Sequence, residues 1–155
     1  MIFVNKFFTY FKSILVPLIV GGAVGFITSK YMNLDTLNKP FLTPPSIVFP
    51  IAWGILYVLM GISYGILKDK GLTDKKIDIV YYVQLVINAL WSIFFFVLKW
   101  RLFAFIWILL LLASVIKMTV EFYKRNKISG LLQIPYILWI VFASYLNLTL
   151  YLLNR

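Results

Sequence analysis

The sequence predicts an all-α integral membrane protein, built as a bundle of five transmembrane helices. Hydrophobic residues make up 63% of its 155 positions and charged residues only 13%, whereas a soluble domain is about half apolar and about a quarter charged. The hydrophobic residues gather in five long blocks, and about 20 consecutive apolar residues cross a bilayer. Only short connections remain, so we expect residues 1–155 to form a single transmembrane domain.

The five helices are expected at about residues 11–30, 46–67, 77–98, 102–123 and 131–153. The first is interpreted as a retained helix, because no clear small-x-small cleavage site follows its apolar stretch. The second begins after Pro44 and Pro45, because proline is excluded from a helix interior. Gly71 marks the turn into the third helix, residues 99–101 form a tight turn into the fourth, and residues 124–130 form a basic loop before the fifth.

Two pairs of glycines have the spacing that lets helices approach closely. Gly21 and Gly25 lie four residues apart in the first helix, and Gly61 and Gly65 repeat this spacing in the second. Small residues at this interval permit close backbone packing in membranes. The pairs are expected to serve either packing within the chain or association of two copies.

The net charge of +10 does not indicate nucleic-acid binding, because the basic residues stand mostly at the ends of the apolar blocks. There they are expected to contact membrane lipid and to set the orientation of the chain. The N-terminal segment and the loops after the second and fourth helices carry nine Lys and Arg, against five on the other side. This bias predicts an N-terminus inside and a C-terminus outside a bacterial cytoplasmic membrane.

Neither cysteine nor histidine is present, which excludes disulfides, Cys/His zinc sites and histidine-ligated haem. We expect no metal site and no required cofactor, and any tetrapyrrole would be held by packing and hydrogen bonds. Lys117 and Glu121, four residues apart near the basic end of the fourth helix, are expected to pair along the helix surface. Carboxylates at mid-depth are missing, which disfavours ion-coupled transport.

Aromatic and amide side chains recur at helical spacing in three of the predicted helices. Each stripe alone is compatible with simple packing or an interfacial aromatic belt. Three stripes of similar chemistry favour a site for a flat, mostly apolar ligand with a few polar atoms. The stripes are Pro50, Trp53, Tyr57, Gly61 and Tyr64; Tyr81, Gln84, Asn88, Trp91 and Ser92; and Pro135, Trp139, Ala143, Asn147 and Tyr151.

Several blocks of the sequence resemble the TspO/MBR family, the tryptophan-rich sensory proteins related to the mitochondrial translocator protein. The matching residues are Lys39, Pro40, Phe41, Leu42, Thr43, Pro44 and Pro45, then Phe49 to Trp53 and Tyr57, then Gln84, Asn88, Trp91, Ser92, Phe95 and Phe96, then Pro135, Tyr136, Trp139, Phe142, Ala143, Tyr145, Leu146, Asn147 and Asn154. The resemblance spans the whole chain. It implies a five-helix bundle, commonly a homodimer, with a ligand cavity capped by the first loop, residues 31–45.

The resemblance also implies ligands and site residues. The family's ligands include porphyrins, haem, cholesterol-like lipids and benzodiazepine-type drugs, so we expect a tetrapyrrole or lipid-like small molecule. Trp53 and Trp139 correspond to tryptophans implicated in light-driven porphyrin degradation by some bacterial members. With the stripes, the expected ligand-binding residues are Trp53, Tyr57, Gln84, Asn88, Trp91, Trp139, Ala143 and Asn147.

One departure from the family pattern concerns the lid. The family loop usually carries tryptophan where this chain has Leu42, and a second usual tryptophan is replaced by Ile47. The first of these tryptophans is thought to help cover the ligand, so its absence is expected to weaken porphyrin binding or degradation.

The sequence leaves several functions open. The leading hypothesis is a membrane receptor or sensor that binds tetrapyrroles, with movement or sequestration of the ligand as a further role. The alternatives are a light- and oxygen-dependent porphyrin-degrading enzyme that uses Trp53 and Trp139, a facilitated transporter of lipids or sterols, and a structural partner in a larger complex. The lining offers no acid, base, thiol or metal ligand for conventional catalysis.

Overall fold

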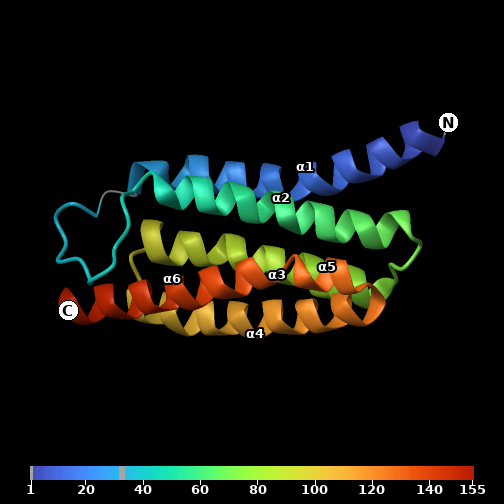
Figure 1. The fold of residues 1–155 in the computed structure, drawn as a ribbon. Coiled ribbons are helices and arrows are strands. Elements are labelled where there is room, and N and C mark those ends of the chain that lie inside the picture. The colour runs from blue at the N-terminus through green and yellow to red at the C-terminus, as the bar shows by residue number, and fades with distance from the viewer. Residues whose placement is uncertain (1, 32–33) are drawn as a thin grey trace.

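The computed structural model describes residues 2–31 and 34–155, and every regular element in these ranges is helical. Figure 1 shows the helices running side by side along one long axis. In chain order the elements are α1 (Ile2–Thr28), η1 (Ser29–Tyr31), α2 (Val48–Asp69), α3 (Lys75–Ser92), η2 (Ile93–Val97), α4 (Arg101–Arg125), α5 (Lys127–Leu131) and α6 (Ile134–Leu153).

Five segments of the described chain are long and apolar enough to cross a membrane: Ile2–Tyr31, Val48–Asp69, Lys75–Val97, Arg101–Arg125 and Lys127–Leu153. The prediction of an all-α protein with five membrane helices is therefore confirmed. The third span combines α3 with the π-helical segment η2, and the fifth combines α5 with α6.

The first helix begins much earlier than the sequence predicted. α1 starts at Ile2 instead of residue 11. Residues 2–10 contain no proline or glycine that would break a helix. Within this extension the Thr9 hydroxyl donates to the Asn5 carbonyl at 2.9 Å. Lys6 Nζ also lies 3.6 Å from a carboxylate oxygen of Asp69 at the end of α2.

The last span is interrupted, whereas the sequence predicted one helix over 131–153. α5 is a short helix whose first turn is capped by Asn126, because the Asn126 side chain accepts from the Ser129 N–H at 3.0 Å. Pro135 stands in the first turn of α6. Its missing N–H leaves the helical hydrogen bond to the Leu131 carbonyl unmade, which explains a break at this point.

α1 packs directly on α2 through the second glycine pair. Gly61 lies against the backbone of Ser13 and Ile14, and Gly65 lies against the ring of Tyr10. A β-carbon at position 61 would overlap the α1 backbone, so glycine is required there for the two helices to approach. The Gly61/Gly65 pair therefore serves packing within the chain.

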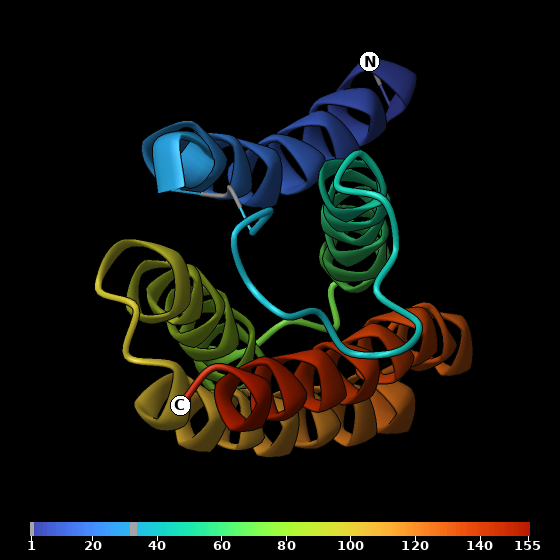
Figure 2. The same cartoon turned by 90° about the vertical axis from the view of Figure 1, so that its left-hand side faces the viewer.

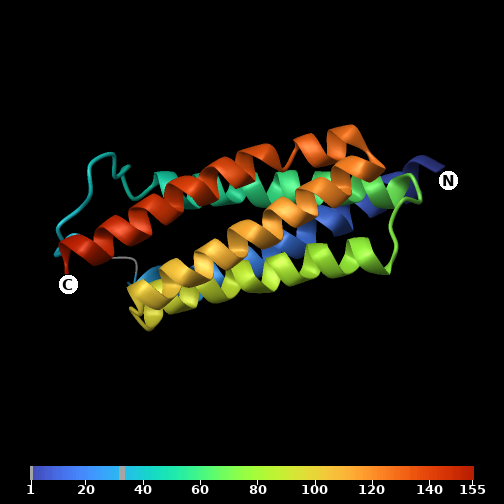
Figure 3. The same ribbon diagram turned by 90° about the horizontal axis from the view of Figure 1, so that it is seen from below.

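The remaining long helices form a second group. α4 packs against both α3 and α6, and in Figure 3 it runs diagonally from the end of α3 toward α5. α2, by contrast, has at most sparse close backbone contact with α3 and α6. Figure 2 shows α1 and α2 on one side of the molecule and α3, α4 and α6 on the other. The two groups touch where α1 passes α3 and where α2 passes α5, and long side chains fill the space between α2, α3 and α6.

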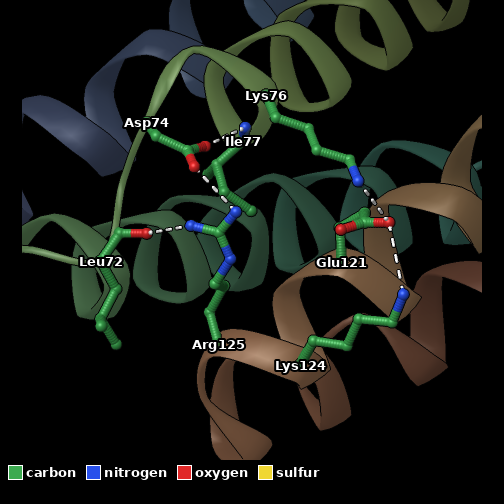
Figure 4. A network of polar contacts seen from close by, with 7 residues as sticks. All are labelled: Leu72, Asp74, Lys76, Ile77, Glu121, Lys124 and Arg125. Carbon is green, nitrogen blue, oxygen red and sulfur yellow. Dashed lines mark hydrogen bonds and ion pairs between the residues drawn. The ribbon is translucent and has the colours of Figure 1, made fainter.

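The loop between α2 and α3 is fastened to α4 by a polar network (Figure 4). Asp74 caps α3 by accepting from the Ile77 N–H at 3.0 Å. Arg125 Nη2 lies 2.8 Å from the Asp74 carboxylate, and Arg125 Nη1 donates to the Leu72 carbonyl at 3.2 Å. The Ile77 N–H, and then the Arg125 guanidinium, hold the pKa of Asp74 below its ordinary value of 3.8.

The predicted pair of Lys117 with Glu121 is wrong. The Glu121 carboxylate lies 3.3 Å from Lys76 Nζ at the start of α3 and 3.7 Å from Lys124 Nζ, as Figure 4 shows. Because Glu121 is directed toward α3, it joins two helices instead of pairing with Lys117 along one of them. Lys117 is exposed on the surface of α4.

Candidate functional site

The predicted site residues come together where α2, α3 and α6 face one another. Residues three and four apart share one face of a helix, and each of these helices turns such a face inward. Seven of the eight are linked to one another by ring contacts or hydrogen bonds, directly or through Tyr136, and Ala143 is buried on the same face of α6. The seven are Trp53, Tyr57, Gln84, Asn88, Trp91, Trp139 and Asn147.

The ring of Trp53 is the centre of this aromatic cluster. Its centroid lies 5.7 Å from that of Tyr57, 6.2 Å from Tyr136, and 6.4 Å from both Trp91 and Trp139. The Tyr57 ring is stacked at 26°, while Tyr136 and Trp139 meet Trp53 edge to face at 77° and 89°. Both arrangements are favourable for aromatic pairs. One half-buried indole thus joins rings from all three helices.

A chain of buried polar groups runs beside the rings. The Tyr57 hydroxyl donates to Asn88 Oδ1 at 3.0 Å, and Asn88 Nδ2 donates to the Tyr136 hydroxyl at 2.6 Å. The Tyr136 hydroxyl in turn donates to Gln84 Oε1 at 2.8 Å. Hydrocarbon offers no partner for such groups, so these bonds fix α2, α3 and α6 in one arrangement. The lining is polar yet carries no formal charge.

A second polar link reaches the start of α4. Trp91 Nε1 donates to Asn147 Oδ1 at 3.1 Å, and Asn147 Nδ2 donates to the Arg101 carbonyl at 2.8 Å. Asn147 is 1% exposed, so both of its amide groups are satisfied without water. Asn147 therefore orients the Trp91 indole and joins α6 to the α3–α4 turn.

Trp139 differs from its neighbours because its indole nitrogen is buried and makes no hydrogen bond within the described residues. The ring is flanked by Phe49 at 6.0 Å and Phe142 at 5.6 Å. A buried N–H without a partner is unfavourable by about 1–3 kcal/mol. Such a donor is therefore available to a polar atom of a ligand that reaches the cluster.

The predicted lid, residues 31–45, crosses the end of the bundle between the two helix groups (Figure 2); residues 32 and 33 lie outside the described residues. Hydrogen bonds fasten it to α6 and to Asn154, which follows α6. The Tyr145 hydroxyl donates to the Phe41 carbonyl at 2.7 Å. Asn38 and Asn154 form a reciprocal pair, with Asn38 N–H to Asn154 Oδ1 and Asn154 Nδ2 to the Asn38 carbonyl, both at 2.8 Å.

The tip of the lid turns its side chains outward. Phe41 is 83% exposed and Leu42 is 65% exposed, so neither covers the aromatic cluster in this arrangement. Leu42 has φ 73°, a left-handed conformation that is unfavourable for a branched side chain. The Thr43 hydroxyl donates to the Pro40 carbonyl at 2.7 Å and closes the turn around it.

Tyr136 is the site residue that the sequence-based prediction omitted. It is 1% exposed, contacts Trp53 and bonds both Asn88 and Gln84. Its position three residues before Trp139 places it on the same face of α6, so the helical spacing was a usable signal. The described residues contain no group of three or more His, Cys, Asp or Glu that could hold a metal ion.

Comparison with known proteins places these features in one family. The TspO/MBR family model matches residues 13–152. The tryptophan-rich protein TspO of Archaeoglobus fulgidus is 41% identical over 145 residues, which cover 92% of this chain and 94% of that protein. The tryptophan-rich sensory protein of Cereibacter sphaeroides is 33% identical over 121 residues, covering 77% and 75%. The human translocator protein is 32% identical over 115 residues, covering 72% and 68%. The chain therefore belongs to the TspO/MBR family and is an integral membrane protein.

Proposed function

We propose that this protein is a membrane receptor or sensor that binds a tetrapyrrole, such as a porphyrin or haem, among α2, α3 and α6. The observation that carries the proposal is the cluster around Trp53, in which four further rings from three helices surround one indole. When a flat macrocycle enters this cluster, the aromatic side chains lose contacts with one another and gain stacking contacts of the same kind with the ligand. The relatives' names, sensory protein and translocator protein, agree with a receptor role.

Such a ligand would enter between α2 and the pair α3 and α6. Close backbone contact of α2 with α3 and α6 is sparse at most, so large side chains make most of the contact there. Rotation of Trp53 and Trp139 would open room between the helices without breaking a backbone contact. The unpartnered Trp139 N–H then donates to a polar atom of the ligand. The macrocycle is held by packing and hydrogen bonds, without a metal ligand from the protein.

The test is a titration of the purified protein with protoporphyrin IX, followed at the porphyrin absorption band so that removal of an indole does not alter the signal itself. We expect saturable binding that is weakened about tenfold or more in a Trp53→Phe, Trp139→Phe double variant. Trp100→Phe is the matched control, because Trp100 is exposed in the α3–α4 turn. Non-saturable binding, or equal affinity in the double variant and the control, contradicts the proposal.

A second candidate is oxidative degradation of a bound porphyrin in light, with molecular oxygen as the oxidant. The observation that favours it is the position of Trp53 and Trp139, whose centroids lie 6.4 Å apart with perpendicular planes. One bound macrocycle can contact both indoles at this separation. Illumination with porphyrin should convert its absorption spectrum to that of a new product. A Trp139→Phe variant that converts it at the same rate rules out the assigned role.

We also propose a homodimer in a bacterial cytoplasmic membrane. The pair Gly61 and Gly65 is occupied by α1, but Gly22 and Gly25 face open space on the outer side of α1. This small-residue surface suits contact with a second copy. Crosslinking in native membranes should give a dimer that a bulky Gly25→Leu substitution weakens, and a dimer unchanged by this substitution excludes the α1 surface.

A further inference from the structure

An open cavity lies at the lid end of the bundle, between the α3–α4 turn and the end of α6. Its volume is about 510 Å³, and its lining includes Lys99, Trp100, Arg101, Phe103 and Arg155. Figures 1 and 2 show the α3–α4 turn and the end of α6 at the same end of the molecule. This cavity is separate from the aromatic cluster, although the Arg101 carbonyl accepts the bond from Asn147.

The cavity is strongly cationic. Lys99, Arg101 and Arg155 all line it, and none of the ion pairs among the described residues involves these three side chains. Arg101 Nε is buried and has no hydrogen-bond partner within the described residues, while its guanidinium carbon lies 5.6 Å from the Phe95 ring centroid. Three cations without counter-ions favour the binding of an anion.

The backbone adds further donors at the same place. α4 begins at Arg101, and the side chain of its N-cap residue, Trp100, makes no capping hydrogen bond. The first N–H groups of a helix have no partner within the helix and carry partial positive charge. Lys99 has φ 57°, a left-handed backbone conformation that is unfavourable for residues other than glycine. This bend places a lysine directly before the uncapped helix end.

The side chains around the cavity indicate its depth in the membrane. Trp100 is 53% exposed and Phe103 is 43% exposed, and their rings meet edge to face at 6.0 Å. Exposed aromatic residues of this kind concentrate at the level of the lipid headgroups. Leu102 and Leu150 provide apolar walls on α4 and α6. The lining thus combines cationic and apolar side chains, as expected for a cavity at the level of the lipid headgroups.

We propose that this cavity binds the phosphate of an anionic phospholipid. Lys99, Arg101 and Arg155 pair with the phosphate oxygens, and the first N–H groups of α4 donate to them. The acyl chains lie against Leu102 and Leu150. The proposal does not depend on tetrapyrrole binding, because no residue of the aromatic cluster contacts the phosphate.

The experiment is native mass spectrometry of the full chain in detergent with equal amounts of dioleoyl phosphatidylglycerol and dioleoyl phosphatidylcholine. We expect retention of one phosphatidylglycerol in about tenfold preference to phosphatidylcholine. A Lys99→Gln, Arg101→Gln double variant should lose this preference. The matched control is Lys70→Gln with Lys127→Gln, which removes the same charge at the opposite end of the bundle and should retain the preference.

Two further measurements distinguish a bound lipid from a free anion and from a loss of the folded turn. Lys99→Gly accepts the positive φ and so keeps the turn folded, yet it should still weaken the preference because it removes a cation. Inorganic phosphate should displace the lipid only at far higher concentration than the lipid itself. Displacement at equal concentration would identify a free-anion site and overturn the lipid assignment. An unchanged preference in the Lys99/Arg101 variant, or equal loss in the control, overturns the whole site.

Discussion

The ring centroids of Trp53 and Trp139 lie 6.4 Å apart with their planes at 89°, although close backbone contact between α2 and α6 is sparse at most. Contact between the two helices is therefore made by large side chains in this region. Side-chain contacts rearrange by rotation, whereas close backbone packing such as that of α1 on α2 does not. The molecule thus combines a closely packed helix pair with an interface that is made mainly of side-chain contacts.

The contact between α1 and α2 depends on the absence of a side chain at position 61. A β-carbon there would overlap the backbone of Ser13 and Ile14, so Gly61→Ala should destabilise the fold by about 1–3 kcal/mol. Gly54→Ala is the matched control, because a β-carbon at that position of α2 meets nothing within 4 Å and Gly54 lies outside the proposed dimer surface. The control should be neutral or more stable by up to about 1 kcal/mol. Thermal unfolding in detergent measures both, and equal stability of the two variants contradicts the packing argument.

The sequence was sufficient to predict the five spans, because long apolar blocks have few other solutions. It also predicted the members of the aromatic cluster other than Tyr136, because residues three and four apart share a helix face. The sequence did not predict which residues of one stripe contact which neighbouring helix. On α2, Trp53 and Tyr57 face the cluster, whereas Gly61 contacts α1 and Tyr64 stacks on Tyr81 at 4.2 Å.

Contacts between helices were beyond the reach of sequence spacing. The expected pair of Lys117 with Glu121 obeyed the helical interval, but Lys76 of α3 lies closer to the Glu121 carboxylate. The spacing of Tyr136 from Trp139 indicates its helix face, but not its hydrogen bonds to Asn88 and Gln84 of α3. The outward direction of Phe41 and Leu42 depends on a left-handed backbone that periodicity does not reveal.

The polar chain should contribute to stability through Asn88. Asn88→Leu removes the acceptor of the Tyr57 hydroxyl and one donor to the Tyr136 hydroxyl. We expect a loss of about 1–2 kcal/mol, since hydrogen bonds between membrane helices are individually modest. Asn5→Leu is the control, because Asn5 is exposed on α1. Unfolding in mixed detergents gives the free energies, and a loss no greater than that of the control means that the chain is not stabilising.

The lid should be loosened by removal of a single hydroxyl. Tyr145→Phe deletes the 2.7 Å hydrogen bond to the Phe41 carbonyl and leaves the ring in place. Hydrogen exchange of the amides in residues 38–45 should quicken about two- to tenfold, the effect of one net hydrogen bond. Tyr123→Phe, at the far end of α4, changes an exposed tyrosine and should leave this exchange unchanged. Unaltered exchange in Tyr145→Phe would show that Asn38 and Asn154 hold the loop without it.

Acid should weaken the fastening of the α2–α3 loop through Asp74. Its pKa is lowered in the folded protein by the Ile77 N–H and by Arg125, so its stabilising effect is complete above its ordinary pKa. The effect is lost as the pH falls through the lowered folded pKa. Asp74→Asn keeps a capping side chain but does not titrate. Between about pH 6 and about pH 3, which spans the ordinary pKa of Asp, the melting temperature of this variant should fall less than that of the parent protein. Parallel melting curves for the two proteins would exclude Asp74 as a source of the acid sensitivity.

Trp139 offers the sharpest separation of stability from binding. Its buried indole N–H has no partner within the described residues, and Trp139→Phe removes that unfavourable donor while it leaves a smaller ring. The relief of about 1–3 kcal/mol and the loss of packing act in opposite directions. We therefore expect the ligand-free variant to unfold within about 1 kcal/mol of the parent. Protoporphyrin affinity should nevertheless fall, because the donor is lost. Trp107→Phe is the control, since the Trp107 N–H already donates to the Ile87 carbonyl at 2.9 Å. The Trp107→Phe control should lose stability and keep its affinity for protoporphyrin. If Trp107→Phe lowers the affinity and Trp139→Phe does not, the ligand lies away from Trp139.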